Sequence, residues 1–335
     1  MGWKEKITGF FESKKPSTEK DEPFKPTDIQ NEPTETIQKT VQPTDPQNLT
    51  AQENPSQKLP YTEEQAAEYA RQAAELVKKH TAIPYLEFEL TDSHPSIYES
   101  KVGGLPYLPG EPPMDHKGNP MRLLAQINCE DLKALEDYPH TGILQFWLTT
   151  EWEWNDTKLI YYAQIDHTLL EDDIVQKLNA AEWEHMDSFP VTGEHGLDFS
   201  LKTGSMGRDD TRLMALFCQY YTELSGDYIS CPEDAGDGEF GETVYDVWER
   251  FSDNCDRYGN AVGGYPSITQ LVDYISYGQD MSIDLTSPVL LFQLDSDMHS
   301  RNVMWGDLGI GHFLIEREDL LHLNFSNAWF YWDCS

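Results

Sequence analysis

The densest group of residues that could carry out chemistry lies near the C-terminal end of the sequence. Asp295 and Asp297 flank a serine, and Trp305, Asp307 and His312 follow within a short stretch. In an extended strand Asp295 and Asp297 project to the same side, because side chains alternate with a period of two. Three carboxylates could hold a hard cation or accept hydrogen bonds from an arginine. These five residues are therefore the candidate binding site.

Turn chemistry explains the same residues more simply. An aspartate in a turn caps backbone N–H groups with its carboxylate, and Trp305 would then pack over a core. The sequence favours this explanation over a cation site. It assigns no catalytic residue, no metal ligand and no cofactor.

Other motifs that could indicate catalysis fail on physical grounds. Gly236, Gly238 and Gly241 spell the dinucleotide fingerprint G-x-G-x-x-G. Their loop is acidic and would repel a pyrophosphate, and no β-α-β unit surrounds it. Walker loops, G-x-S-x-G elbows and H-E-x-x-H helices do not occur, and neither Cys218 nor Cys231 has a nucleophile signature around it. The question of an enzyme stays open, and the sequence favours a non-enzymatic protein.

Strands are predicted to position these residues. Alternating apolar residues begin with Y-L-E-F-E-L at 85–90 and recur in L-L-A-Q-I-N, I-L-Q-F-W-L and K-L-I-Y-Y, separated by Gly, Pro and Asp. One helix is predicted to precede them at about 62–80. Thr62 and Gln65 form its capping box, and Pro84 prevents its continuation.

The strand region repeats itself. V-G-G-L-P at 102–106 recurs as V-G-G-Y-P at 262–266, and L-L-A-Q and G-I-L recur 167 residues later as L-L-F-Q and G-I-G. Three elements in the same order, two of them in one register, indicate a duplication. The earlier copy lacks the acidic set of the candidate site: Asn128, Glu130 and His140 stand at the positions of Asp295, Asp297 and Asp307.

The expected fold is α+β, with a β-rich body of two repeated, mostly antiparallel sheet units and peripheral helices. The body spans 61–335, with the first unit at about 84–165 and the second at about 220–335. Residues 166–219 between them are expected to form loops and helices. In both units the Gly-Gly-x-Pro segment is expected to form a turn, because glycine permits positive φ and proline fixes the exit. A connecting turn is favoured over a ligand loop.

Residues 1–60 are predicted to form a disordered tail. They hold eight of the 20 prolines and few apolar residues, so they bury too little surface to offset chain entropy. Residues 1–14 differ, because four apolar side chains share one helical face. This segment is either an anchor for a partner groove or a membrane surface, or a frayed tail. The anchor residues would be Trp3, Ile7, Phe10 and Phe11.

The charge of the chain limits its partners. Its 335 residues include 24 Lys and Arg against 59 Asp and Glu, a formal net charge of −35. This charge disfavours nucleic acid and suits a basic protein partner. The sequence has no transmembrane stretch and no signal-peptide pattern. Five widely spaced cysteines without C-x-x-C favour reduced thiols, and therefore a cytoplasmic location.

Several segments together resemble one known family. They are VGGLPYLP, PMRLLAQIN, PHTGILQFWL, VGGYPSITQ, LLFQLDSD, MWGDLGIGHFLI and the terminal FYWDC. With these motifs the chain resembles the YwqG-like family of uncharacterised bacterial proteins over about 60–335. The resemblance implies a mixed fold of two similar units, but it carries no catalytic residues. Its members are similar in setting to proteins found beside bacterial toxin systems, which implies an immunity-type or other binding role.

Two classes of function follow. The first is a cytoplasmic binding protein, in one form toxin-neutralising, whose acidic surface meets a basic partner. The second is an enzyme or small-ligand receptor with its site in the cleft between the two units. The charge and the missing catalytic signatures favour the first.

Overall fold

The computed structural model describes residues 61–152, 154–178, 189–210, 212–268, 288–297 and 302–334. All of them fall in one compact unit, Lys58–Ser335. The predicted disordered tail and its anchor residues lie outside the described residues. Among the helices that are described, none is both long enough and apolar enough to cross a membrane.

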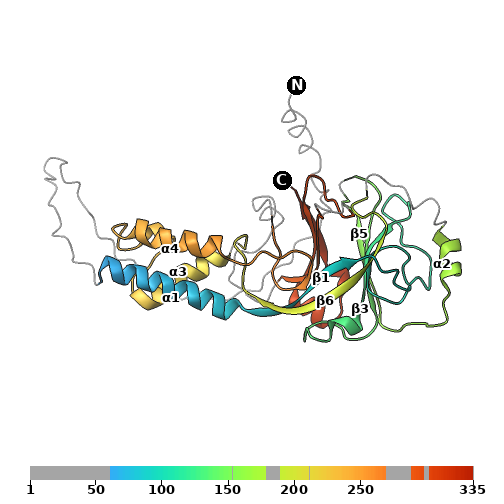
Figure 1. Ribbon diagram of the computed structural model, residues 1–335, viewed down its shortest axis with the longest axis horizontal. Coiled ribbons are helices and arrows are strands. Elements are labelled where there is room, and N and C mark those ends of the chain that lie inside the picture. Colours follow the sequence, from blue (N-terminus) through green and yellow to red (C-terminus); the bar gives the residue numbers. More distant parts are fainter. Residues whose placement is uncertain are drawn as a thin grey trace, which may run out of the picture. The chain divides into compact units, whose positions relative to one another are not determined.

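Strands and helices follow one another along the described chain (Figure 1). The strands are β1 (Ile83–Thr91), β2 (Lys101–Gly103), β3 (Arg122–Asn128), β4 (Ile143–Leu148), β5 (Thr157–Tyr162), β6 (Glu194–Gly204), β7 (Ala261–Gly263), β8 (Val289–Asp295), β9 (Ile310–Ile315) and β10 (Trp329–Asp333). The helices are α1 (Glu63–Thr81), α2 (Glu171–Leu178), α3 (Arg212–Ser225), α4 (Gly241–Asp253) and α6 (Arg317–Leu321), with short 3₁₀ turns η2 (Cys129–Leu132), η4 (Pro232–Asp234) and η5 (Phe325–Asn327).

All ten strands belong to one sheet, in the order β10-β9-β8-β7-β1-β6-β2-β3-β4-β5. Every strand pairing is antiparallel, so the predicted α+β class with a mostly antiparallel sheet is confirmed. The long strands β1 and β6 pair at the centre of this order. We call β2–β5 the first sheet half and β7–β10 the second.

One expectation about the segment between the halves was wrong. Residues 166–219 were expected to form loops and helices, yet they contain the central strand β6. Leu197, Phe199 and Leu201 alternate with polar residues there, which is a strand signal. The helix α2 lies where helix was expected.

The two sheet halves share one pairing register. In the first half Gln126 pairs with Gln145, and in the second Gln293 pairs with His312, 167 residues later in both strands. Both ladders shift register at the same place, between Leu123 and Ala125 and between Leu290 and Phe292. A shift of one residue in either ladder would have turned its side chains to the other face. We call residues that this register aligns counterparts.

The main core lies between the two halves. The ring of Phe146 on β4 packs 4.9 Å from that of Phe292 on β8 and 4.9 Å from that of Phe313 on β9. Smaller clusters cover the outer faces, around Trp147 in the first half and around Leu314 in the second. The inner faces of the halves therefore meet, and each outer face has its own cover.

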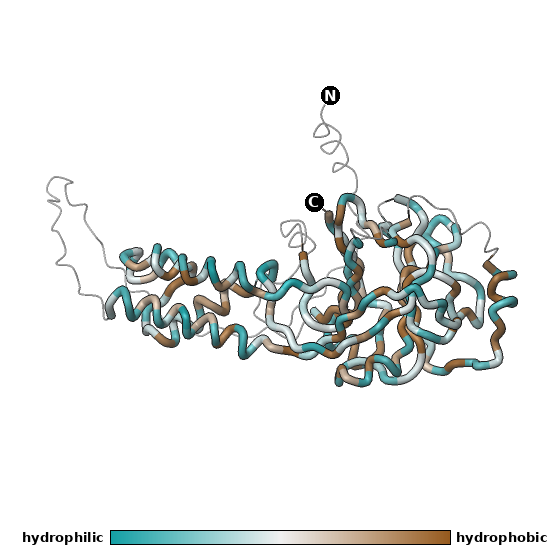
Figure 2. Tube along the Cα trace, viewed as in Figure 1, coloured by the Kyte–Doolittle hydropathy of each residue, from teal (hydrophilic) through white to brown (hydrophobic). Residues whose placement is uncertain are grey.

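Three helices form a separate apolar cluster. Figure 1 shows α1, α3 and α4 side by side, and Figure 2 shows apolar and polar residues alternating along them. The predicted capping box of Thr62 and Gln65 is confirmed at the start of α1. Small residues of α1 allow close packing against Phe217 on α3 and Trp248 on α4. These alanines are Ala66, Ala70, Ala73 and Ala74.

Candidate functional site

The structure separates the five residues of the predicted site. Asp295 ends β8 with its side chain half-buried, and His312 lies buried in β9. The ring of Trp305 packs against Gly311 on the inner side of β9, where an added Cβ atom would come within 2.5 Å of that ring. Gly311 precedes His312 in the strand, so the side chain of His312 points to the opposite face of the sheet.

His312 stands in a closed polar environment. Its Nε2 atom lies 2.6 Å from the carbonyl oxygen of Ser267, and its Nδ1 atom lies 3.2 Å from that of Tyr331. Burial lowers the pKa of His312, while the nearby carboxylate of Asp333 acts in the opposite direction. A neutral imidazole donates only one hydrogen bond, which the shorter contact assigns to Ser267. His312 is thus fully buried between two backbone carbonyl oxygens.

Trp305 has an apolar environment on the other face. Its ring lies edge-on to Trp154 at 5.2 Å and near Phe330 at 5.7 Å. Its Nε1 atom is buried without a hydrogen-bond partner in the described part of the chain. This position agrees with the packing role expected from turn chemistry.

The three candidate carboxylates have different surroundings. The backbone N–H of Asp297 donates to the carbonyl oxygen of Val303 at 3.0 Å. Asp307 is exposed in a turn in which the Gly309 N–H donates to the carbonyl oxygen of Trp305. Burial raises the pKa of Asp295, against a hydrogen bond from the Ser296 backbone. Within the described ranges no group of three or more His, Cys, Asp or Glu could hold a metal ion.

Two of the cysteines, Cys129 and Cys218, lie buried. Burial raises the pKa of Cys129 and of Cys218 to about 12 each. A catalytic thiol needs the opposite shift, toward the thiolate.

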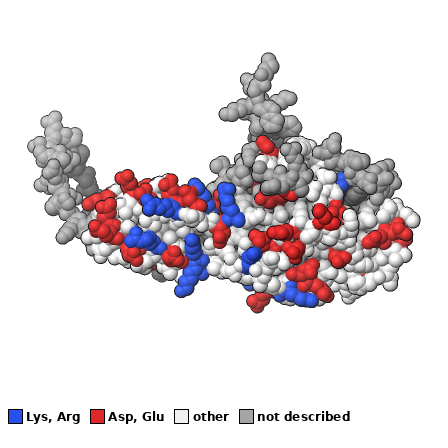
Figure 3. All heavy atoms as spheres, in the orientation of Figure 1, with Lys and Arg blue, Asp and Glu red and all other residues white. Residues whose placement is uncertain are grey.

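An acidic surface lies at the end of the helical cluster where α1 and α4 begin. Residues 213–249 contain nine acidic residues and no Lys, Arg or His. Figure 3 shows acidic side chains gathered at this end, with basic side chains closer to the middle of the helices. Glu63 of α1 joins it, because Thr243 of α4 donates to its Oε1 atom at 2.7 Å. We call the exposed members the acidic end: Glu63, Glu64, Glu233, Asp234, Asp237, Glu239 and Glu242.

A tyrosine stands exposed in the loop of this acidic end. Tyr228 is 82 % exposed, the highest value of any large apolar side chain that the structure describes. The loop around it is fixed, because Asp227 accepts hydrogen bonds from the Tyr61 hydroxyl at 2.5 Å and the Gly236 N–H at 2.7 Å. An aromatic side chain held in water by a fixed loop is typical of a binding hot spot.

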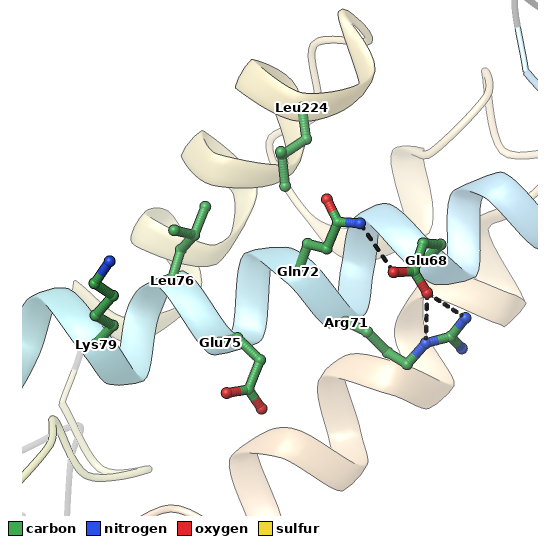
Figure 4. A pocket seen from close by; sticks show the side chains of 7 residues that line it. All are labelled: Glu68, Arg71, Gln72, Glu75, Leu76, Lys79 and Leu224. Carbon is green, nitrogen blue, oxygen red and sulfur yellow. Dashed lines mark hydrogen bonds and ion pairs between the residues drawn. The ribbon is translucent and has the colours of Figure 1, made fainter.

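A groove of about 680 Å³ runs along α1 beside α3 (Figure 4). Figure 4 shows Arg71 and Gln72 both directed at Glu68, which accepts from them at 2.9 Å each. Leu76 and Leu224 are its only apolar residues among the seven that line it. Its central polar groups already satisfy one another, so the groove is a solvated helix face.

A cleft of about 320 Å³ lies between the two sheet halves. The loop of Leu135 to Tyr138 lines it from the first half, and the Gly263–Gly264 turn lines it from the second. Arg317 lines one side of the cleft and forms a bidentate ion pair with Asp137. The distances are 2.7 Å from Nε to Oδ2 and 2.8 Å from Nη2 to Oδ1. The cleft lies where a site between two units was expected.

Sequence reasoning noticed the acidic loop around Gly236 but gave it no binding role, and it missed the cleft residues. The stretch without a basic residue over 213–249 was visible in the sequence and could have indicated the acidic end. The pairing of Arg317 with Asp137 bridges 180 positions, and no local pattern marks it.

Comparison with known proteins gives one family and no characterised relative. A family model described as a domain of unknown function (DUF1963) matches residues 100–334. The match covers most of both sheet halves, and the resemblance to YwqG-like proteins is consistent with it. A search of the curated proteins finds no match.

Proposed function

The chain belongs to the DUF1963 family, and we propose that it is a non-enzymatic binding protein whose acidic end meets a basic protein partner. The observation that carries this proposal is the exposed acidic loop around Tyr228, in a segment of 37 residues without a positive charge. Neutralising a basic toxin is one form of this role.

Charge and exposure support the proposal in different ways. Exposed charges of one sign speed the encounter with a partner of the opposite sign. Tyr228 would then supply apolar contact area, since tyrosine is enriched among the residues that dominate interface energies. The raised pKa values of Cys129 and Cys218 support the non-enzymatic part.

Affinity capture from an extract of the native cell tests the proposal. The test variant removes three charges from the acidic end and the adjoining face of α4, through Asp237→Asn, Glu239→Gln and Asp246→Asn. These three side chains were chosen because none of them has a described hydrogen bond. A matched control removes three exposed charges from α2: Glu171→Gln, Asp172→Asn and Asp173→Asn.

A basic protein should bind the unchanged chain and the α2 variant, and high salt should release it. The acidic-end variant should bind it at least about tenfold more weakly, as expected when several interfacial charges are lost. Equal capture by both variants would contradict the proposal.

A second candidate function is an enzyme or small-ligand receptor that uses the cleft between the sheet halves. The cleft volume of about 320 Å³ supports it, since small-molecule sites begin near this size. Of the three charged residues that line it, Asp137 and Arg317 pair with each other, and Glu136 is exposed. This pairing leaves little for catalysis and favours the binding role.

We also propose a cytoplasmic location and an internal duplication. Cys129, Cys218, Cys231 and Cys255 are present as thiols, which supports a reducing compartment. The shared register supports the duplication, with the first unit at about 84–165. Because β1 pairs with β7 as β6 pairs with β2, the second unit would begin at β6 near 194 and not near 220. Superposition of the two units in a crystal structure tests this proposal.

A further inference from the structure

The cleft between the sheet halves has a counterpart on the other side of the molecule, and there it is filled. Gly103 pairs with Glu194 of β6 as Gly263 pairs with Tyr85 of β1. The segment that leads into β6, residues 189–193, therefore corresponds to residues 80–84, which end α1 and begin β1. The two segments have different structures, because α1 extends to Thr81.

The segment at 189–193 runs extended beside the loop at 302–304. Val191 and Val303 form an antiparallel bridge. The Thr192 N–H donates to the carbonyl oxygen of Asn302 at 2.8 Å, and the Met304 N–H donates to that of Pro190 at 2.8 Å. Residues 189–193 are thus joined to this loop by backbone hydrogen bonds.

The side chains of this segment fill the space next to the first Gly-Gly turn. An added Cβ atom on Gly103 would lie 2.3 Å from the carbonyl oxygen of Gly193 and 3.1 Å from Val191. The ring of Phe189 lies under the guanidinium of Arg122, at 4.9 Å.

The counterparts of these contact residues line the cleft. Leu135, Glu136 and Asp137 correspond to residues 302–304, and Val289 corresponds to Arg122. An added Cβ atom on Gly263 would find only the Leu135 side chain within 3.4 Å. The chain before β1 turns into α1, so no described residue fills the place that corresponds to Pro190–Thr192.

The backbone of the cleft is partly available for hydrogen bonding. The Leu135 carbonyl oxygen already accepts from the Tyr138 N–H at 3.2 Å and lies 3.0 Å from His140 Nε2. No hydrogen bond of the Asp137 N–H is found within the described residues, and this group corresponds to the Met304 N–H that binds Pro190. A strand laid beside the loop would offer it a carbonyl oxygen.

We propose that the cleft binds an extended peptide segment of a partner protein, with chemistry like that of Phe189–Gly193. The partner's peptide places a β-branched residue against Gly263 and Leu135 and an apolar ring over Val289. One of its carbonyl oxygens accepts a hydrogen bond from the Asp137 N–H. This proposal does not depend on the acidic end.

Binding of a synthetic peptide with the sequence F-P-V-T-G, capped at both ends, tests the proposal. Titration calorimetry with the full chain should show saturable binding with a Kd of roughly 10 μM to 1 mM, the range of a short strand with few anchors. Pro84→Trp and Glu136→Trp each place a bulky ring at the mouth of the cleft, from exposed positions. Each should weaken binding at least about tenfold.

The matched control is Glu89→Trp, an exposed position further along β1 and outside the cleft. It should leave the affinity unchanged. The absence of saturable binding to the unchanged chain would overturn the proposal. Equal affinity of the two cleft variants and the control would also overturn it, because the peptide would then bind elsewhere.

Discussion

His312 and Gln145 direct a side-chain nitrogen at the same point of their respective sheet halves. The Nε2 atom of His312 lies 2.6 Å from the carbonyl oxygen of Ser267, and that of Gln145 lies 2.7 Å from the carbonyl oxygen of Tyr107. Ser267 and Tyr107 each follow a Gly-Gly-x-Pro turn. A titratable group thus stands in one half where the other half has a neutral amide.

This difference predicts a pH dependence that one substitution removes. The pKa of His312 is lowered by burial, whereas an unfolded histidine titrates near 6.5. As the pH falls below about 6.5, the unfolded chain binds a proton that the folded chain does not, so the free energy of unfolding decreases. His312→Gln should abolish this component and stay within about 1 kcal/mol of the unchanged chain at pH 8.

Urea unfolding of both proteins between pH 5 and pH 8 measures this effect. Other titrating groups are common to both proteins, so the difference between the two curves isolates His312. Parallel curves over the whole range would show that His312 has an ordinary pKa when folded.

The two buried glutamines should be equally important for stability. Gln126 accepts from the Tyr107 N–H at 2.7 Å and donates to the carbonyl oxygens of Ile97 and Glu99. Gln293 makes the same set with Ser267, Tyr258 and Gly259. Leucine at either position leaves buried backbone groups unpaired, which costs roughly 1–3 kcal/mol for each group.

Denaturant unfolding should therefore show a loss of at least about 2 kcal/mol for Gln126→Leu and for Gln293→Leu. The exposed Gln219→Leu is the control and should change stability by less than about 0.5 kcal/mol. A loss in only one of the two buried variants would show that the two turns are not held alike.

Gly103 should tolerate a side chain less well than Gly118. Both have positive φ, 67° at Gly103 and 84° at Gly118. An added Cβ atom at Gly103 would lie 2.3 Å from the Gly193 carbonyl oxygen, whereas one at Gly118 would have no atom within 4 Å. Gly118→Ala should cost about 1–2 kcal/mol for the backbone alone. Gly103→Ala should lower the melting temperature clearly further, and equal melting temperatures would refute the close approach.

The body should fold without residues 1–57. Tyr61 packs on Tyr69 and Phe240, so the apolar packing of the body already begins at that residue. A chain that starts at Lys58 should melt within a few degrees of the full chain, measured by circular dichroism. A much lower melting temperature would mean that the predicted tail stabilises the body.

The sequence predicted local structure better than the arrangement of strands. The capping box of Thr62 and Gln65 and the shared spacing of the two ladders depend on neighbouring residues, and both follow from local rules. The exchange of β1 and β6 between the sheet halves depends on pairings across more than 90 positions. No local pattern encodes such a pairing.

The residues of the candidate site are divided between two faces for a related reason. Asp295, Trp305 and His312 are close in sequence, but the strand alternation of β9 and the preceding turn place Trp305 and His312 on opposite faces. The residues now favoured, Tyr228 and its acidic neighbours, carry no motif. Exposure reveals them, and exposure is a property of the folded chain.

Photo-cross-linking from position 228 in the native cell tests the central claim most directly. A photoreactive phenylalanine analogue replaces Tyr228 in one protein and, as the control, Val175 of α2, which is 39 % exposed, in another. The account predicts a covalent adduct with one basic protein from position 228 and none from position 175. No adduct from position 228, or the same adducts from both positions, would contradict it.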